Sequence, residues 1–340
     1  MSAPRRIAVD AMGGDCGVSV TVPASVRALQ KHSNLQLDLV GDKNLIGPLL
    51  QDVPQPLVSR LRLIHSAQRI PAGKRPQSVL RASRDSSLYL AVDLVKQGKV
   101  GAMVSAGDTG ALLLIGRHLL KTLSGINKPA ILATLPSVSE PCYLLDVGAN
   151  PECDSRQLFE FAVMGTVLAE SLGRSVPRVG LLNIGSEDYK GSSAVLQTAA
   201  ALEQCADLNY IGFIEANELF EGAAEVVVCD GFVGNVTIKS SAGVANVVSK
   251  LLARATSTAE QHPLIRSLSA QLNPQRFNGA SLLGLQGSVV KSHGNATAEG
   301  FFYAIEQAIR EIDHGIPQLI GKRVADIMSS NQGLLTGGKN

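Results

Sequence analysis

The sequence predicts an α/β fold in which a largely parallel sheet carries helices on both sides. Short apolar runs alternate with longer amphipathic stretches along the 340 residues. Several of these runs are apolar almost throughout, as expected for strands that are buried on both faces. Hydrophobic residues make up 45% of the chain and charged residues 18%, which favours a globular core over disorder. Strands that alternate with helices favour parallel pairing, because each helix returns the chain to the same edge of the sheet.

Ten short apolar runs are the expected strands. In chain order they read RIAVDA, LQLDLV, LRLIHS, VGAMVSA, AILATLP, CYLLDV, RVGLLNIG, YIGFIE, EVVVCD and GSVVK. Each is five to eight residues long, and aromatic residues are scarce at 4%, so the core must consist mainly of aliphatic side chains. The length and spacing of the runs suit one large α/β unit, and we expect residues 1–340 to form a single domain.

Two helices can be bounded from their end signals. Residues 154–173 begin with an aspartate that can cap a helix, carry Gln157 three positions later and end at Gly173. A second helix is expected over about 295–312, where apolar residues line one face, and Gly315 and Pro317 should close it.

The overall composition excludes several classes of protein. Lys and Arg number 31 against 29 Asp and Glu, a net charge of +2, and no long basic run occurs, so we expect no nucleic-acid partner. The five cysteines are odd in number and form no CxxC, which argues against disulfides and a zinc site and for buried, reduced thiols at Cys142 and Cys229. No signal peptide and no apolar run of spanning length is visible, so a cytoplasmic protein with at most peripheral membrane contact is expected.

Six polar, glycine-rich segments follow directly after expected strands. They are DAMGGD (10–15), SAGDTGA (105–111), LDVGAN (145–150), NIGSEDYKG (183–191), DGFVGN (230–235) and KSHGNA (291–296). Ligands of open α/β sheets bind at the carboxyl ends of the strands. We therefore predict that the six segments gather along one edge of the sheet and form one site.

The segments have the features of anion-binding loops. Glycine leaves backbone N–H groups free to face an anion, and a following helix adds the positive end of its dipole, so Thr109, Gly110 and Ala111 could present such N–H groups. Lys190 supplies a point charge suited to phosphate. It precedes Gly191, the reverse of the P-loop order, and neither GxGxxG nor GxSxG occurs. Without an activated nucleophile, these loops suit a reaction in which the substrate, for example inorganic phosphate, attacks.

Six ordered motifs resemble one known family. AVDAMGGD, SAGDTGALL, LLDVGAN, GLLNIGSEDYKG, EVVVCDGFVGNVTIK and LLGLQGSVVKSHG look like the acyl-ACP:phosphate acyltransferases of bacterial phospholipid synthesis (PlsX), over about residues 7–308. Two positions depart from the family pattern: Asp108 stands where Asn is also common, and Ala216 stands where glycine is expected. The second departure puts only the local loop geometry in doubt.

The resemblance implies a fold, an activity and partners. The fold would be an α/β/α sandwich with a mostly parallel sheet, similar to isocitrate and isopropylmalate dehydrogenases and to phosphate acetyltransferase, with a helical excursion near residues 255–285. The activity would be transfer of a long acyl chain from acyl carrier protein to inorganic phosphate, with no metal and no organic cofactor. The protein would be a homodimer that associates with the membrane, where a glycerol-3-phosphate acyltransferase uses the acyl phosphate.

The reaction that the resemblance implies suggests a role for each motif residue. Thr109 and Gly110, with Lys190 as the cation, would hold phosphate; Asn235 would donate to the oxyanion, and His293 would protonate the leaving thiol. The expected catalytic residues are Asn183, Lys190, Asp230, Asn235, Lys239 and His293. The expected phosphate- or substrate-binding residues are Asp10, Gly13, Gly14, Asp15, Ser105, Asp108, Thr109, Gly110, Asp146, Asn150 and Gly191.

Several alternatives stay open at this stage. Lys190 can be an exposed helix-start lysine, Asn235 a cap, His293 a structural histidine, and Asp15 a turn residue. A covalent route would use Cys229 as the acyl carrier. The apolar surface around 232–252 and 262–285 suits an acyl channel, whereas the stripe at 263–272 suits a membrane contact, a dimer contact or core equally well. A short-chain acyl-CoA enzyme, a decarboxylating dehydrogenase and a non-enzymatic carrier-protein scaffold are the competing functions.

Overall fold

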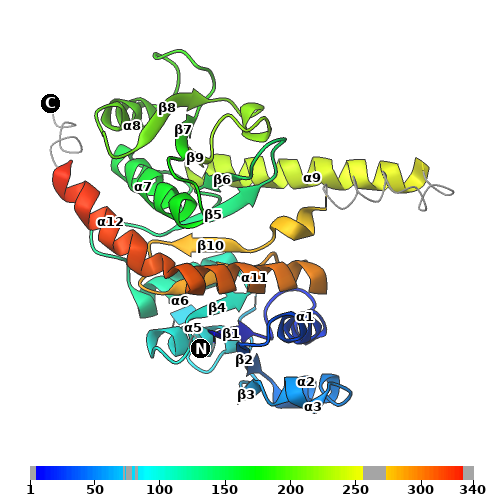
Figure 1. The fold of residues 1–340 in the computed structure, drawn as a ribbon. Helices are drawn as coiled ribbons and strands as arrows, with labels where there is room; N and C mark the ends of the chain where they lie inside the picture. Colours follow the sequence, from blue (N-terminus) through cyan, green and yellow to red (C-terminus); the bar gives the residue numbers. More distant parts are fainter. Residues whose placement is uncertain (1–4, 72, 74–78, 81–82, 256–272, 332–340) are drawn as a thin grey trace.

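One continuous sheet runs through the molecule (Figure 1), and the described residues contribute eleven strands to it. The computed structural model describes residues 5–331 except 72, 74–78, 81–82 and 256–272. The strand order is β3-β2-β1-β4-β11-β10-β5-β6-β9-β7-β8. The strands are β1 (Arg5–Asp10), β2 (Leu35–Gly41), β3 (Leu61–His65), β4 (Ala102–Ser105), β5 (Ala130–Leu135), β6 (Cys142–Leu145), β7 (Arg178–Leu182), β8 (Asn209–Ile214), β9 (Val226–Val228), β10 (Ala280–Leu283) and β11 (Ser288–Lys291).

Helices cover both faces of the sheet, as the sequence predicts. One face, which we name the α6 face, carries α5 (Ser87–Lys96), α6 (Thr109–Leu120) and the start of α9 (Gly231–Ala255). The opposite face carries α1 (Val18–Lys31), α7 (Ser155–Ser171), α8 (Ser193–Glu203), α11 (Ala298–His314) and α12 (Ile316–Ser330). The remaining short helices are α2 (Lys43–Leu49), α3 (Gln55–Val58), η1 (Glu218–Phe220) and η2 (Pro274–Phe277).

The two halves of the sheet run in opposite directions. In one half β1 pairs in parallel with β2 and β4, and β11 continues this direction beside β4. β10 is antiparallel to both β11 and β5, and β5 is antiparallel to β6. The second half, β6, β9, β7 and β8, is parallel within itself and therefore points opposite to β1, β4 and β11. The predicted loops consequently leave the sheet at two edges.

All ten expected strands are present, and one further strand was missed. Residues 280–283 form β10, which pairs with β5 and β11 in the middle of the sheet. The expectation of a helical excursion through 285 is therefore wrong at its end, although η2 gives one short helical turn at 274–277. The apolar stripe expected at 263–272 lies outside the described residues.

The two helices bounded from the sequence form almost as expected. Asp154 caps α7, its carboxylate accepts from the Gln157 backbone N–H at 2.8 Å, and the Gln157 side chain completes the capping box. The apolar residues of α7 pack against the sheet and against the neighbouring helices α8 and α12. Thirteen of the seventeen residues of α7 are therefore buried. Gly315 ends α11 in the left-handed conformation, and Pro317 then lies in the first turn of α12 rather than in a loop.

Buried aliphatic side chains fill three clusters, one on the α6 face and two on the opposite face. Cys142 and Cys229 are buried free thiols, as predicted. Among the described helices, none combines the length and apolar character needed to cross a membrane.

Candidate active site

The first edge of the sheet gathers the loops after β1, β4 and β11. The strand order shows why a site forms here: from β1 the chain moves outward to β2 and β3 and then returns to β4 on the other side of β1. The loops at such a switch point leave in opposite directions and open a binding position. The Asp15 N–H donates to the Gly294 carbonyl oxygen at 2.8 Å, and the Ser292 N–H donates to the Ser105 carbonyl oxygen at the same distance. The three loops are thus hydrogen-bonded to one another.

Asp10 lies at the centre of this edge and is fully buried. The Ser105 hydroxyl donates to its Oδ2 at 2.7 Å, and the Gly107 N–H in turn donates to the Ser105 Oγ at 2.9 Å. A side chain at residue 13 would clash with Asp10 and the Gly107 nitrogen, so only glycine allows the two loops to meet here. Burial raises the pKa of the Asp10 carboxyl above its usual value, although hydrogen bonds from Ser105 and Ser87 partly oppose this.

The N-terminus of α6 points into the same edge. Asp108 caps the helix, and its carboxylate accepts from the Ala111 N–H at 2.9 Å. The backbone N–H groups of Thr109 and Gly110 have no hydrogen-bond partner among the described residues. They are available to an anion, as predicted, whereas the Ala111 N–H, predicted with them, is not, because the Asp108 cap accepts its hydrogen bond.

His293 also lies at the first edge, in the loop after β11, and is exposed. Its backbone N–H donates to the Asn278 Oδ1 at 3.0 Å, and its Nδ1 lies 3.5 Å from the Asn295 nitrogen. No carboxylate among the described residues forms an ion pair with this ring. The geometry is that of a turn histidine with an open ring edge.

The second edge gathers the loops after β6, β7 and β9. Asp146 and Asn150 are buried there, and their polar atoms are used within the protein. The Asp146 carboxylate accepts backbone N–H bonds from Ile131, Gly148, Ala149 and Asn150, and the Asn150 amide donates to Asp146 and to the Pro129 carbonyl. These two side chains hold the loop in shape and have little capacity left for a substrate.

Helix α9 begins against this loop because two of its residues are glycines. The Gly231 N–H donates to the Asn150 carbonyl at 2.7 Å. A Cβ atom at residue 234 would clash with the Asp146 carbonyl oxygen, which is backbone and cannot move aside easily. Asp230 caps the helix by accepting from the Val233 N–H at 2.9 Å. The close contact places the next residue, Asn235, beside Gly148.

Asn235 and Lys239 lie one helical turn apart on α9 and so share a side of it. Asn235 is half-buried and Lys239 is exposed. Within the described part of the chain, neither side chain has a hydrogen-bond or ion-pair partner. Both are available to a ligand.

The loop at 183–191 is closed by its own first residue. The Asn183 amide donates to the carbonyl oxygens of Gly185 and Lys190, at 3.2 and 2.9 Å. Gly191 has a φ of 111°, a conformation that favours glycine. The Lys190 ammonium pairs with the Glu187 carboxylate, 2.7 Å from Oε2, and folds over Gly185. Asn183 thus shapes the loop, and Glu187 is the partner of Lys190 when no ligand is bound.

The expectation that all six loops share one edge is wrong. Asp10, Gly13, Gly14, Asp15, Ser105, Asp108, Thr109, Gly110 and His293 lie at the first edge, whereas Asp146, Asn150, Asn183, Lys190, Gly191, Asp230 and Asn235 lie at the second, where α9 with Lys239 also begins. The physical reason is the reversal of strand direction across β10, β5 and β6. No contact joins Lys190 to Thr109 and Gly110 within the described part of the chain.

The α6 face connects the two edges. Side chains alternate along a strand, so Asp10 and Ser105 project on the same side as Ala8 and Met103, which pack in the α6-face core. Ile238 of α9 packs against that same core. From the second edge α9 runs along β5 and β6 and contacts η2, which in turn packs on α11 (Figure 1). Helix α6 and the start of α9 therefore lie on the same face of the sheet, with their free groups toward different edges.

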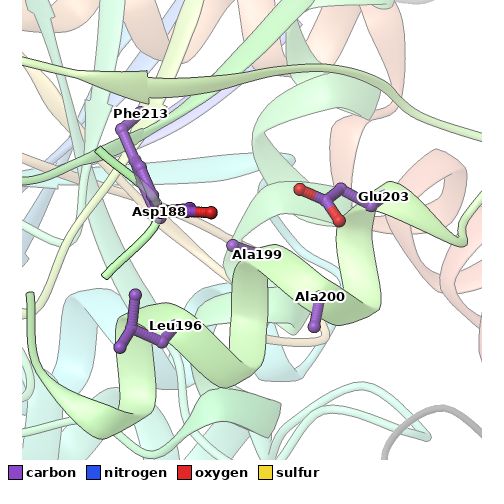
Figure 2. A pocket seen from close by; sticks show the side chains of 6 residues that line it. All are labelled: Asp188, Leu196, Ala199, Ala200, Glu203 and Phe213. Atoms are coloured by element: carbon purple, nitrogen blue, oxygen red, sulfur yellow. The ribbon is translucent and has the colours of Figure 1, made fainter. Parts of the chain in front are cut away.

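A cavity of about 170 Å³ lies apart from these groups, between α8, β8 and the 183–191 loop (Figure 2). Its lining consists of Asp188, Leu196, Ala199, Ala200, Glu203 and Phe213. None of the expected site residues lines it. Two carboxylates in an otherwise apolar cavity disfavour phosphate, so we do not place the substrate there.

Comparison with known proteins identifies the family. Residues 5–319 match the family described as fatty acid synthesis protein. A phosphate acyltransferase of Shewanella sp. (strain MR-4) is 46% identical over 332 residues, covering 95% of this chain and 97% of the relative. A phosphate acyltransferase of Stutzerimonas stutzeri (strain A1501) is 48% identical over 332 residues, covering 95% of this chain and 93% of the relative. The chain belongs to the phosphate acyltransferase family.

Solved structures share the fold of this family member. A phosphotransacetylase from Streptococcus pyogenes superimposes with a TM-score of 0.61 at 18% identity, covering 91% of this chain and 95% of that one. A 4-hydroxythreonine-4-phosphate dehydrogenase from Salmonella typhimurium gives a TM-score of 0.51 at 13% identity, covering 91% and 99%. At these identities the likeness concerns the fold alone. It confirms the predicted relation to phosphotransacylase and dehydrogenase-like sandwiches.

Two further groups bear on the chemistry of this family member. Cys229 is buried, and burial raises the pKa of its thiol well above the usual value, so the thiolate that a covalent route needs is disfavoured. Lys291 was not singled out from the sequence, although it opens the KSHGNA segment. It is the last residue of β11 and lies beside Ser105 of β4 in the register of the sheet.

Proposed function

We propose that this protein transfers a long-chain fatty acyl group from acyl carrier protein to inorganic phosphate and yields acyl phosphate for lysophosphatidate synthesis. Membership of the phosphate acyltransferase family supports an acyl transfer that involves phosphate. The observation that carries the proposal is a set of unpaired donors on the α6 face, the N–H groups of Thr109 and Gly110 at the first edge and the side chains of Asn235 and Lys239 toward the second. Donors of this kind suit an anionic nucleophile and a developing oxyanion.

We propose direct attack. A phosphate oxygen attacks the thioester carbonyl, Asn235 donates to the oxyanion, and the thiolate of the carrier arm leaves. The raised pKa of the buried Cys229 thiol argues against an acyl-cysteine intermediate. Holding both substrates in place supplies much of the rate, because phosphate near neutral pH is already a nucleophile.

We also propose the domain organisation, the partners and the cellular location of the protein. A single continuous sheet supports one catalytic unit over residues 1–340. The partners would be acyl carrier protein, a second copy of the chain and a membrane glycerol-3-phosphate acyltransferase. The protein would work in the cytoplasm, in peripheral contact with the inner face of the membrane.

The test is release of free carrier-protein thiol from palmitoyl-carrier protein, with and without inorganic phosphate. We expect release that depends on phosphate, together with an acyl phosphate that hydroxylamine traps. Release without phosphate would indicate a thioesterase, and retention of the carrier protein without release would indicate a scaffold. Faster turnover of acetyl-CoA than of palmitoyl-carrier protein would favour the short-chain alternative.

A further inference from the structure

Lys291 is placed among the groups of the proposed site. It ends β11 opposite Ser105, which ends β4 opposite Asp10, so three neighbouring strands present a lysine, a serine and an aspartate in one row. Val289, two residues earlier, packs in the α6-face core, and Lys291 therefore projects on that face with Ser105 and Asp10. This is the face of the free N–H groups of α6.

The Lys291 ammonium is incompletely paired. Its one hydrogen bond goes to the Ser292 carbonyl oxygen, and no carboxylate oxygen of the described residues lies within the 4 Å of an ion pair. The Asp10 Oδ1, buried in the same row, also has no hydrogen-bond partner in the described part of the chain, although the Ser87 hydroxyl is near enough to lower the pKa of that carboxyl. A buried carboxylate oxygen without a partner, in one row with a half-buried ammonium that has N–H donors to spare, indicates a place for a ligand or a proton.

We propose that Lys291 is the catalytic acid that protonates the leaving thiolate, an inference that rests on the proposed acyl transfer. As the C–S bond breaks, its electron pair goes to sulfur, and one N–H proton of Lys291 moves to that sulfur. The carbonyl carbon gains its bond to a phosphate oxygen. The proton that hydrogen phosphate carried is released from the new acyl phosphate and restores the ammonium, so no further reactant is needed.

The electrostatic setting suits proton donation. The charged groups that face Lys291 are Asp10 from β1, Asp15 from the next loop and Asp108 from the start of α6, and these three carboxylates favour the protonated ammonium. Burial lowers the pKa of Lys291 to about 8, the three carboxylates opposing this shift. An acid near this value is well matched to a thiol, whose pKa is about 8.5. The exposed His293 has no comparable setting.

The experiment compares two acyl donors that differ only in the leaving group. An alkyl thioester, palmitoyl-pantetheine, needs a proton on sulfur, whereas the 4-nitrothiophenyl thioester of palmitate leaves as a stable thiolate. With wild-type protein and phosphate, we expect kcat for the alkyl donor to fall above about pH 8 and kcat for the aryl donor to stay level. An equal fall for both donors overturns the proposal without any variant.

Two variants sharpen the comparison. Lys291→Met should lower kcat for the alkyl donor by about 10² to 10³-fold and leave the aryl donor within a few-fold, with little change in the KM for phosphate. Lys291→Arg keeps the charge but cannot release a proton near neutral pH, so it should fail in the same way. Activity on the aryl donor reports that each variant is folded. Lys96→Met, an exposed lysine at the far end of α5, is the matched control and should resemble wild type.

Results that contradict the role of Lys291 can be told apart from results that contradict the proposed function. Equal losses on both donors, or a loss confined to the KM for phosphate, would assign Lys291 to structure or to anion binding. Full alkyl activity in both Lys291 variants would remove it from the chemistry. If wild-type protein itself releases no thiol in the presence of phosphate, the proposed function fails instead.

Discussion

At the scale of single residues, the site differs from a plain anion-binding site because two of its lysines, Lys190 and Lys291, lie near carboxylates. Lys190 is paired with Glu187, and Lys291 is surrounded by carboxylates at a greater distance. Hydrogen bonding from Lys190 lowers the pKa of Glu187, so the carboxylate stays ionised at neutral pH and keeps the pair intact. Phosphate that binds Lys190 must therefore compete with Glu187.

This competition gives the first prediction. Glu187→Gln should lower the KM for phosphate by a factor of about two to five and leave kcat unchanged, because an exposed ion pair is weak but its loss frees the ammonium. Initial rates against phosphate concentration measure it. Asp188→Asn removes the same charge from the same loop without touching Lys190 and is the control. If both variants lower KM equally, the effect comes from net charge and the pair has no role.

At the scale of elements, α11 carries an ionisable group into the core. Glu311 is fully buried under β10 and β11, near Ser281, Ser288 and Gln307, beside a cavity of about 10 Å³. Burial raises the pKa of its carboxyl to about 7, from 4.5 for the ordinary side chain. The folded protein therefore holds this proton over a pH range in which the unfolded chain has lost it.

The sign of the pH dependence follows. Because the native state binds the extra proton, the contribution of Glu311 to the free energy of unfolding is fully present below about pH 4.5. This contribution is lost as the pH rises through about 7. The shift corresponds to roughly 3 kcal/mol lost across that window. Urea unfolding of wild type and Glu311→Gln at pH 5 and pH 8 measures it. The variant should lose less stability between the two pH values, by about that amount, and parallel losses would show that Glu311 is not the group responsible.

At the scale of the whole molecule, α9 extends well beyond the sheet (Figure 1). Its 25 residues span about 37 Å. The large apolar residues Val233, Val236, Val244, Val247 and Leu251 are exposed on it, at spacings of three, four and multiples of these that place them on one stripe. A stripe of this length is costly to leave in water, and we expect a second copy of the chain to cover it.

The dimer prediction is tested by mass in solution. Light scattering after size-exclusion chromatography should give a mass of twice 35.7 kDa for the wild-type protein. The double variant that combines Val244→Glu and Val247→Glu should have the mass of a monomer. Asn246→Glu adds a charge to an exposed position off the stripe and should stay dimeric. A monomeric wild type that binds anionic vesicles through the same two valines would instead assign the stripe to the membrane.

Much of the fold is readable from the chain because strands, caps and turns are local. The ten apolar runs, the Asp154 capping box and the Gly315 terminus each depend on a few neighbouring residues, and each forms as predicted. The motif residues and the family could be recognised for the same reason. One non-local feature also had a sequence signal: only residues 136–141 separate β5 from β6, too few for the crossover that parallel strands require.

The tertiary structure alone decided how these pieces meet. Pairing across β10, β5 and β6 reverses the sheet and sends the six loops to two edges, because strand direction depends on partners distant in sequence. Parallel pairing of β11 with β4, and of β4 with β1, put the motif lysine Lys291 in register with Ser105 and Asp10, which are distant from it along the chain. Burial then changed the chemistry of Asp10, Cys229 and Glu311, since the solvation of a charge depends on what surrounds it in space. The sequence by itself determined which elements and chemical groups this protein has, and the fold determined which of them share a site.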